Sequence, residues 1–226
     1  MIVNVDNSLS NIKNLKWLPW IGDQYYSISK NKRILIVGES HYHNGTNQSK
    51  NNHESVEFTR RVVQEMAIER WYYGTKIFPN FHKALFSHDY FDSSTFWNLV
   101  SFYNFVQRPM STNIERPIPS DFYNGWNPFF EIVKVLKPEV CIFIGVGASS
   151  SLKKAANASG VHLKSMERDC RVGRTYPRRA IITANGDADI KLLFLQHTSK
   201  YFSWSAWNSY LKNTIQEELD WFKKMV

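Results

Sequence analysis

The chain has 226 residues and a formal net charge of +8. This length suits one domain with a full hydrophobic core, so we expect a single domain over residues 1 to 226, in which residues 1 to 32 form an N-terminal arm packed on the core. No apolar stretch approaches the ~20 residues that span a bilayer, and two cysteines are too few for a disulfide framework. We therefore expect a cytoplasmic protein without membrane contacts, and the basic charge favours a polyanionic partner such as nucleic acid.

The first half of the chain contains two predicted strands and one predicted helix. A short, β-branched apolar run predicts a buried strand at residues 34 to 37, which ends where Gly38 lets the chain turn. A capping-box pattern and apolar residues at helical spacing predict a helix from about 53 to 71. The aromatic-rich segment from 72 to 100 is expected to be irregular and to form a pocket wall. Residues 102 to 106 have the composition of a second strand.

The second half of the chain continues the alternation of helices and strands. Asn127-Pro128 predicts the start of a helix, with proline at its first position. Residues 140 to 144 and 192 to 195 predict two more buried strands, and 161 to 180 is basic and loop-like. One amphipathic helix is expected to end the chain. This alternation predicts a three-layer α/β/α fold around a mainly parallel central sheet.

Polar residues are placed at the ends of three of the predicted strands. Glu39 follows the first strand, Asn104 lies in the second, and His197 follows the last. Because ligands bind beyond the carboxyl ends of parallel strands, these three side chains are expected to converge on one crevice. Each also has a structural alternative: Glu39 as a helix cap, Asn104 as a partner for backbone groups, and His197 as a core histidine.

The order of these features resembles the uracil-DNA glycosylase superfamily over roughly residues 33 to 211. In the bacterial and archaeal branches of that family, an Asn-containing strand leads into an Arg-Pro loop, a helix, a proline and a buried strand that ends in glycine. Gly38-Glu39 looks like the family's first motif, and His197-Thr198-Ser199 looks like its His-Pro-Ser motif. The other matching segments are Tyr103-Asn104-Phe105-Val106-Gln107-Arg108-Pro109, Arg116-Pro117, Asn127-Pro128, Leu136-Lys137-Pro138 and the strand that ends at Gly145.

The chain departs from the family pattern in both outer motifs. His41-Tyr42 stands where the family usually has Pro-Gly, and Thr198 replaces the proline of the third motif. With two cysteines, the chain cannot hold the four-cysteine iron-sulfur cluster of some branches. The resemblance therefore leaves the identity of the target base open.

The resemblance implies a base-excision enzyme that extrudes a damaged nucleotide and cuts its N-glycosidic bond without a cofactor. Bond cleavage leaves positive charge on the sugar and negative charge on the base. Glu39 would stabilise the sugar cation and activate water, and His197 would donate a hydrogen bond to the departing base. Asn104 would read the edge of the base, and Tyr42 is a candidate for stacking on it.

Basic and polar residues outside this set are expected to bind DNA. The protein is expected to be a monomer. A run of arginines between positions 168 and 179 is the densest positive segment, although a solvated basic loop is the alternative. Tyr201 follows the third motif, where relatives place a wedge, and its alternative is to pack under the last helix. The DNA-binding candidates are Ser40, Arg108, Ser199, Lys200, Tyr201, Arg171, Arg174 and Arg178.

Two other functions and one metal site are alternatives to this prediction. The same fold can serve as a catalytically inactive nucleic-acid-binding module, or as a hydrolase of free nucleosides or nucleotides. His41-x-His43, with His53 or Glu54, has the composition of a metal site, but such spacing is common by chance. We therefore expect no metal.

Overall fold

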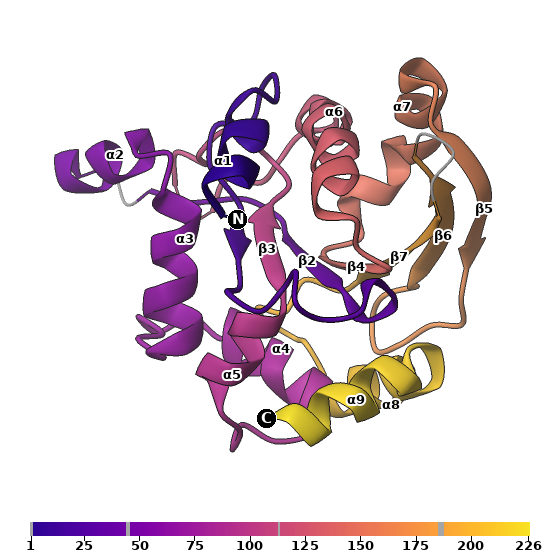
Figure 1. Cartoon of the computed structure of the whole chain (residues 1–226). Coiled ribbons are helices and arrows are strands. Elements are labelled where there is room, and N and C mark those ends of the chain that lie inside the picture. The colour runs from indigo at the N-terminus through magenta and orange to yellow at the C-terminus, as the bar shows by residue number, and fades with distance from the viewer. Residues whose placement is uncertain (1, 44–45, 113, 185–187) are drawn as a thin grey trace.

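The computed structural model describes residues 2–43, 46–112, 114–184 and 188–226 (Figure 1). Within this part of the chain, one seven-stranded sheet runs in the order β1-β3-β2-β4-β7-β6-β5. The strands are β1 Trp20–Ile21, β2 Ile34–Gly38, β3 Ser101–Asn104, β4 Val140–Ile144, β5 His162–Arg168, β6 Arg178–Thr183 and β7 Asp189–Leu195. The helices are α1 Ile2–Ser10, α2 Asn47–Glu54, α3 Phe58–Val62, α4 Ile77–Phe86, α5 Ser93–Leu99, α6 Pro119–Leu136, α7 Leu152–Ser159, α8 Trp204–Thr214 and α9 Gln216–Met225. Short 3-10 helices occupy Lys30–Lys32 and Gly147–Ser151, and a π-helix occupies Val63–Ile68.

The four central strands are parallel, and the strands at both edges of the sheet are antiparallel. β3, β2, β4 and β7 pair in parallel, as the sequence predicted. β1 pairs antiparallel with β3 at one edge, and β6 and β5 continue antiparallel from β7 at the other. The sheet is therefore mixed, with a parallel core to which an antiparallel hairpin, residues 162–183, is added.

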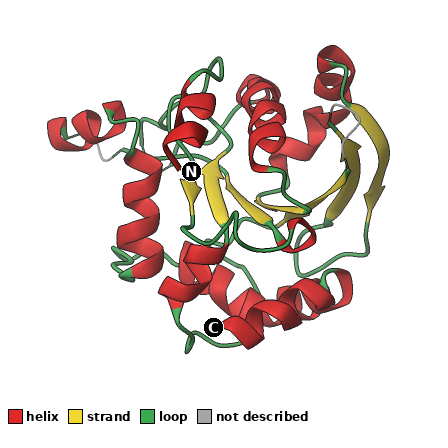
Figure 2. Cartoon of the chain, in the orientation of Figure 1, coloured by secondary structure: helices red, strands yellow, loops and turns green. Residues whose placement is uncertain are grey.

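Side chains of the central strands alternate between two hydrophobic layers. On one face, Leu35 and Phe143 pack with α1, α6 and α7. On the other face, Ile36 and Ile142 pack with α4, α5, α8 and α9. Figure 2 shows these helices on both sides of the sheet. Each large apolar side chain buried in this way contributes about 1.5–3 kcal/mol to the stability of the fold. Because helices cover both faces of the central strands, the sequences of these strands are continuous apolar runs.

The predicted helix from 53 to 71 is wrong in its extent. Ser55 has extended backbone angles, with φ −72° and ψ 127°, so α2 ends before α3 begins. The chain then passes into the π-helix and leaves it near Arg70, which has φ +62°. The capping residue of α2 is Thr46, whose hydroxyl accepts a hydrogen bond from the Ser49 backbone N–H.

The aromatic segment from 72 to 100 is not an irregular pocket wall. It forms α4 and α5, and their large rings lie in the core. Phe81 and Trp97 have no exposed surface. α4 also packs along α8, where the Asn208 side chain donates a hydrogen bond to the carbonyl oxygen of Ala84. These rings stabilise the layer beneath the sheet.

Two further helix boundaries differ from the sequence prediction. α6 begins at Pro119, with the Asp121 carboxylate accepting a hydrogen bond from the Ile118 N–H, and Pro128 lies inside it. The last helix is broken at Ile215, where φ is −137° and ψ is 46°, so α8 and α9 are separate. In the described part of the chain, no helix combines the length and apolarity that crossing a membrane requires.

We predict that Gly125→Ala destabilises the fold by about 1–3 kcal/mol, because α6 lies too close to the end of β3 for a side chain. A Cβ at this position would lie 2.6 Å from Cε1 of Phe105 and 2.8 Å from its carbonyl oxygen. The cost of this overlap exceeds the gain in helix propensity on replacing glycine by alanine, which is about 1 kcal/mol. Urea unfolding measures the change. Asn127→Ala, exposed on the same helix, is the control, and equal stabilities of the two variants would contradict this packing.

Candidate functional site

The order of the parallel strands creates a crevice between β2 and β4. From β2 the chain crosses to β3 on one side, and it then returns to β4 on the other side of β2. Connections that leave in opposite directions open a gap above the carboxyl ends of the two strands, and this is where α/β proteins bind ligands. Glu39 follows β2 and Gly145 follows β4, so both residues lie at this point.

The Glu39 carboxylate leans over Gly145. A Cβ at position 145 would lie 2.8 Å from Oε2 of Glu39, and Gly145 has φ +146°, which side chains disfavour. Burial raises the pKa of Glu39 to about 6, while the Arg116 guanidinium acts to lower it. The helix-cap alternative for Glu39 is wrong, because Thr46 caps the next helix. A desolvated carboxylate therefore faces the crevice.

Asn104 lies beside Glu39 at the end of the neighbouring strand. Its partner across the β2–β3 ladder is Gly38, and a Cβ at position 38 would overlap Oδ1 of Asn104. The backbone carbonyl of Asn104 accepts a hydrogen bond from Nε2 of Gln107 at 2.5 Å. Among the described residues, none makes a hydrogen bond to its side-chain amide, although Asn104 is buried. The amide is therefore not used to satisfy backbone groups at the strand end.

His197 approaches the crevice from its other side. β7 is the neighbour of β4, so the Gly145 strand end separates His197 from Glu39. Burial, with a smaller effect of Arg116, lowers the pKa of His197 to about 4, so the ring is neutral at pH 7. Its Nδ1 lies 2.9 Å from the Ser199 hydroxyl. Asn80 on α4 fixes this loop by donating a hydrogen bond to the Thr198 carbonyl oxygen at 2.7 Å.

Arg116 is the site residue that sequence reasoning missed. Its Nη1 donates to the Tyr42 hydroxyl at 3.2 Å and to the Glu115 carbonyl oxygen at 3.0 Å. Its charge lowers the pKa of both Glu39 and His197. The sequence marked Arg116-Pro117 only as a landmark of the family layout. Glu39, Tyr42 and His197 are far from Arg116 in the sequence and come close to it only when the chain folds.

His41 does not take part in the crevice. Its Nε2 lies 2.9 Å from the Thr59 hydroxyl, and its ring packs edge-on against Trp17 with centroids 4.9 Å apart. Burial and the nearby His53 lower its pKa to about 3. In the described ranges, no three His, Cys, Asp or Glu side chains are grouped closely enough to hold a metal ion.

Ser40 and Arg108, two of the residues predicted to bind DNA, do not lie open at the crevice. The Ser40 hydroxyl is buried and has no hydrogen-bond partner among the described residues. Arg108 makes bidentate hydrogen bonds with Asp121, both at 2.7 Å, and its Nη1 donates to Glu115 at 2.8 Å. It lines a separate cleft together with Lys16 and other residues. The structure therefore places neither group in an open position at the crevice.

The loop after β7 is joined to the tip of the basic hairpin. The Gln196 side chain lies 3.3 Å from the Thr175 hydroxyl and donates to the Tyr201 carbonyl oxygen at 3.1 Å. Arg174 lies over the Tyr201 ring, 4.6 Å from its centroid. Tyr201 is 73% exposed, so the alternative in which it packs under the last helix is wrong. Phe202 takes that place instead, stacked on Trp207.

The remaining predicted DNA contacts lie on this side of the molecule. Ser199 is held next to His197 by the hydrogen bond described above, and Lys200 is exposed beside it. Arg171 is exposed near the tip of the hairpin. Arg178 is the first residue of β6 and lines a cleft. The structure thus gathers Ser199, Tyr201 and Arg174 around the His197 loop, in contrast to Arg108.

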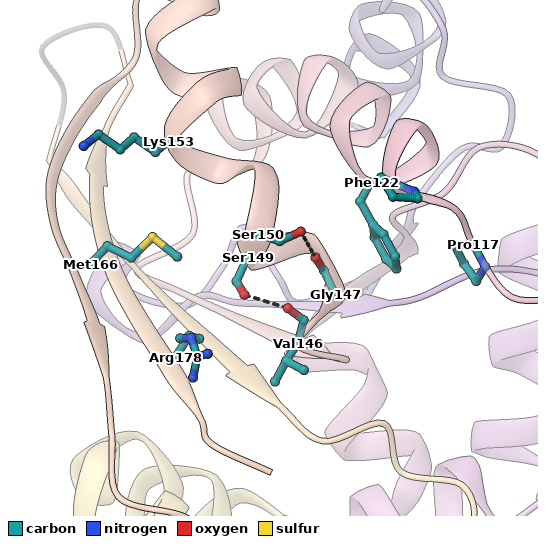
Figure 3. A pocket seen from close by; sticks show the side chains of 10 residues that line it. Pro117, Phe122, Val146, Gly147, Ser149, Ser150, Lys153, Met166 and Arg178 are labelled. Carbon is teal, nitrogen blue, oxygen red and sulfur yellow. Dashed lines mark hydrogen bonds between the residues drawn. The ribbon is translucent and has the colours of Figure 1, made fainter.

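Two cavities meet at Phe122. The smaller one, of about 10 Å³, is lined by Glu39, Gly145 and the strand ends around them, and it has room for roughly one water molecule. The larger one is an open cleft of about 480 Å³ (Figure 3). Phe122 lines both cavities, and its ring covers Gly147, where a Cβ would overlap it. The Phe122 side chain therefore lies between the open cleft and the closed space at Glu39.

The sequence matches no protein-family model and is not detectably similar to any curated protein. The strand ends around Gly145 provide a carboxylate, an amide and a neutral imidazole. A carboxylate can stabilise a cation or take a proton from water, and amide and imidazole groups can bind a polar heterocycle.

We predict that Glu39→Gln stabilises the protein at pH 8 by up to about 2 kcal/mol, with the difference lost near pH 4. The folded-state pKa of Glu39 is raised from 4.5 to about 6, so the ionised carboxylate is unfavourable in the fold at high pH. As pH falls through 6, the folded protein takes up the proton and regains that stability. Chemical unfolding at both pH values tests this, with the exposed Asp23→Asn as control. An effect of equal size at pH 8 and pH 4 would contradict it.

Proposed function

We propose that the protein hydrolyses the N-glycosidic bond of a deaminated or damaged base in DNA, on a fold like that of uracil-DNA glycosylase. The observation that carries the proposal is the Glu39 carboxylate, which is desolvated over Gly145 at the crevice between β2 and β4. Asn104 flanks it at the end of β3, and His197 flanks it at the end of β7.

Glu39 would act on the sugar and on the attacking water. As the bond between C1′ and the base nitrogen breaks, its electron pair leaves with the base, and the sugar becomes cationic. With a pKa of about 6, Glu39 is ionised at neutral pH, yet it is basic enough to accept a proton from water. The water oxygen then bonds to C1′, and the proton passes to the carboxylate.

His197 and Arg116 would stabilise the negative charge on the departing base. His197 is neutral at pH 7, so it contributes a hydrogen bond from a ring N–H and transfers no proton. The Arg116 guanidinium carries a permanent positive charge. Both groups act in a partly desolvated crevice, where charge interactions are stronger than in water.

Asn104 and Tyr42 would hold the base. The Asn104 amide offers one acceptor and two donors, which suits the Watson-Crick edge of uracil or a related base. Tyr42 lies next to Arg116, whose guanidinium carbon is 5.9 Å from the ring centroid. Because the space at Glu39 is about 10 Å³, base binding requires a side chain that lines it, such as Phe122, to move.

We predict that the protein releases a base from oligonucleotides that contain uracil, hypoxanthine or xanthine, and that Glu39→Gln slows this reaction at least ~100-fold. Single-turnover assays on single- and double-stranded substrates measure abasic product, with Asp23→Asn as control. No product on any substrate would overturn the proposal. Binding without turnover, unaffected by Glu39→Gln, would favour an inactive binding module, and cleavage of free nucleosides alone would favour a nucleoside hydrolase.

The pH dependence gives a second prediction. The single-turnover rate should rise through about pH 6, as Glu39 loses its proton and becomes able to act as a base. Arg116→Gln removes the charge that lowers the pKa of Glu39, so the midpoint should move to higher pH, whereas Arg116→Lys keeps the charge and should move it less. A midpoint that is identical in the wild type and Arg116→Gln would contradict the electrostatic coupling.

A further inference from the structure

The open cleft beside the crevice has two walls of different chemistry. In Figure 3, Lys153, Met166 and Arg178 lie on the side of the hairpin, with the segment from Val146 to Ser150 between them and Phe122. Across the cleft from the hairpin lie Pro117 and Phe122, and Pro119 also lines the cleft. One wall is thus largely cationic and the other is apolar and aromatic, in a space of about 480 Å³ that is large enough for a small ligand.

The two cations of the cleft have no carboxylate partners within the described residues. Arg178 donates from Nη1 to the backbone carbonyl oxygens of Tyr176 and Pro177, and Lys153 is exposed on α7. Arg179, the next residue on β6, is instead paired with Glu167 and Asp169, both at 2.8 Å. Since successive residues of a strand point to opposite faces, neutralised charge lies on one face of the hairpin and uncompensated charge on the face of the cleft.

The cationic wall of the cleft continues along the hairpin as arginine and tyrosine pairs, beginning with Arg168, which pairs with Arg178 across β5 and β6. The Arg168 guanidinium lies 3.6 Å from the centroid of the Tyr176 ring, which is 41% exposed. Arg174 covers Tyr201 at the tip in the same way. Unstacked bases bind to aromatic rings and guanidinium planes, while phosphates bind to the cations between them. This combination fits a nucleotide chain better than an isolated anion.

We propose that this cleft binds an unpaired nucleotide next to the target, with its phosphate at Lys153 and Arg178 and its base against Phe122 and Met166. Under the proposed function, on which this inference rests, the substrate is then single-stranded nucleic acid. A base inside a duplex is stacked on both faces and cannot enter a concave cleft, whereas a single strand presents both base and phosphate.

The test measures binding of a fluorescein-labelled oligothymidylate of about eight nucleotides by anisotropy, between ~50 and ~200 mM salt. The double variant Lys153→Gln/Arg178→Gln should weaken binding at least ~10-fold at low salt and should reduce the salt slope by about 0.7, since it removes one neutralised phosphate and each contributes about 0.7 for single strands. Lys224→Gln, an exposed charge on α9, is the matched control and should change affinity less than ~2-fold. Thermal melting verifies that each variant is folded.

Three outcomes would overturn the inference. The first is a double variant that binds like the control, and the second is a duplex of the same length that binds as tightly as the single strand. The third is thymidine monophosphate that competes as well as the oligonucleotide, which would identify a free nucleotide as the ligand. Because oligothymidylate contains no damaged base and the readout is binding, failure here is distinguishable from the absence of glycosylase activity.

Discussion

The site depends on the close approach of the Glu39 carboxylate to Gly145. At this distance, a side chain at position 145 would displace the carboxylate or force the end of β4 away from β2. The φ of +146° at Gly145 excludes most other residues for a second reason. The glycine therefore leaves room for the Glu39 carboxylate over the end of β4, the strand that lies between β2 and β7. The parallel sheet and its two helical layers hold these strand ends in register.

The electrostatics of the crevice follow from burial and one positive charge. Burial makes the Glu39 carboxylate more basic and the His197 ring less basic, so both groups are displaced from their ordinary pKa values in the directions that favour their neutral forms. Arg116 lies close enough to act on both. A carboxylate that is ionised but basic, beside a neutral imidazole and a guanidinium, suits a reaction that separates positive charge on a sugar from negative charge on a base. The cleft beyond Phe122 is lined by the cationic side chains of Lys153 and Arg178.

The sequence predicted the parallel core because long apolar strands have only one stable place, between two layers of helices. It also placed Glu39, Asn104 and His197 at strand ends, since that inference needs only the order of strands and polar residues. It failed where long-range packing decides the outcome. The helix predicted from 53 to 71 breaks at Ser55, and the aromatic segment from 72 to 100 folds into α4 and α5. The prediction of a basic loop at 161 to 180 is wrong, because the charged residues of β5 and β6 hide a one-sided strand pattern at the edge of the sheet.

A crystal structure of the Glu39→Gln variant, with an uncleaved uracil-containing single strand bound, would test the central claim most directly. The variant keeps the shape of the side chain and removes its charge, so substrate should remain intact. The expected result is the sugar C1′ beside residue 39, the base edge at Asn104, and the neighbouring nucleotide in the cleft between Phe122 and Arg178. Nucleic acid bound away from the crevice between β2 and β4, or a residue 39 side chain that does not face it, would contradict the claim.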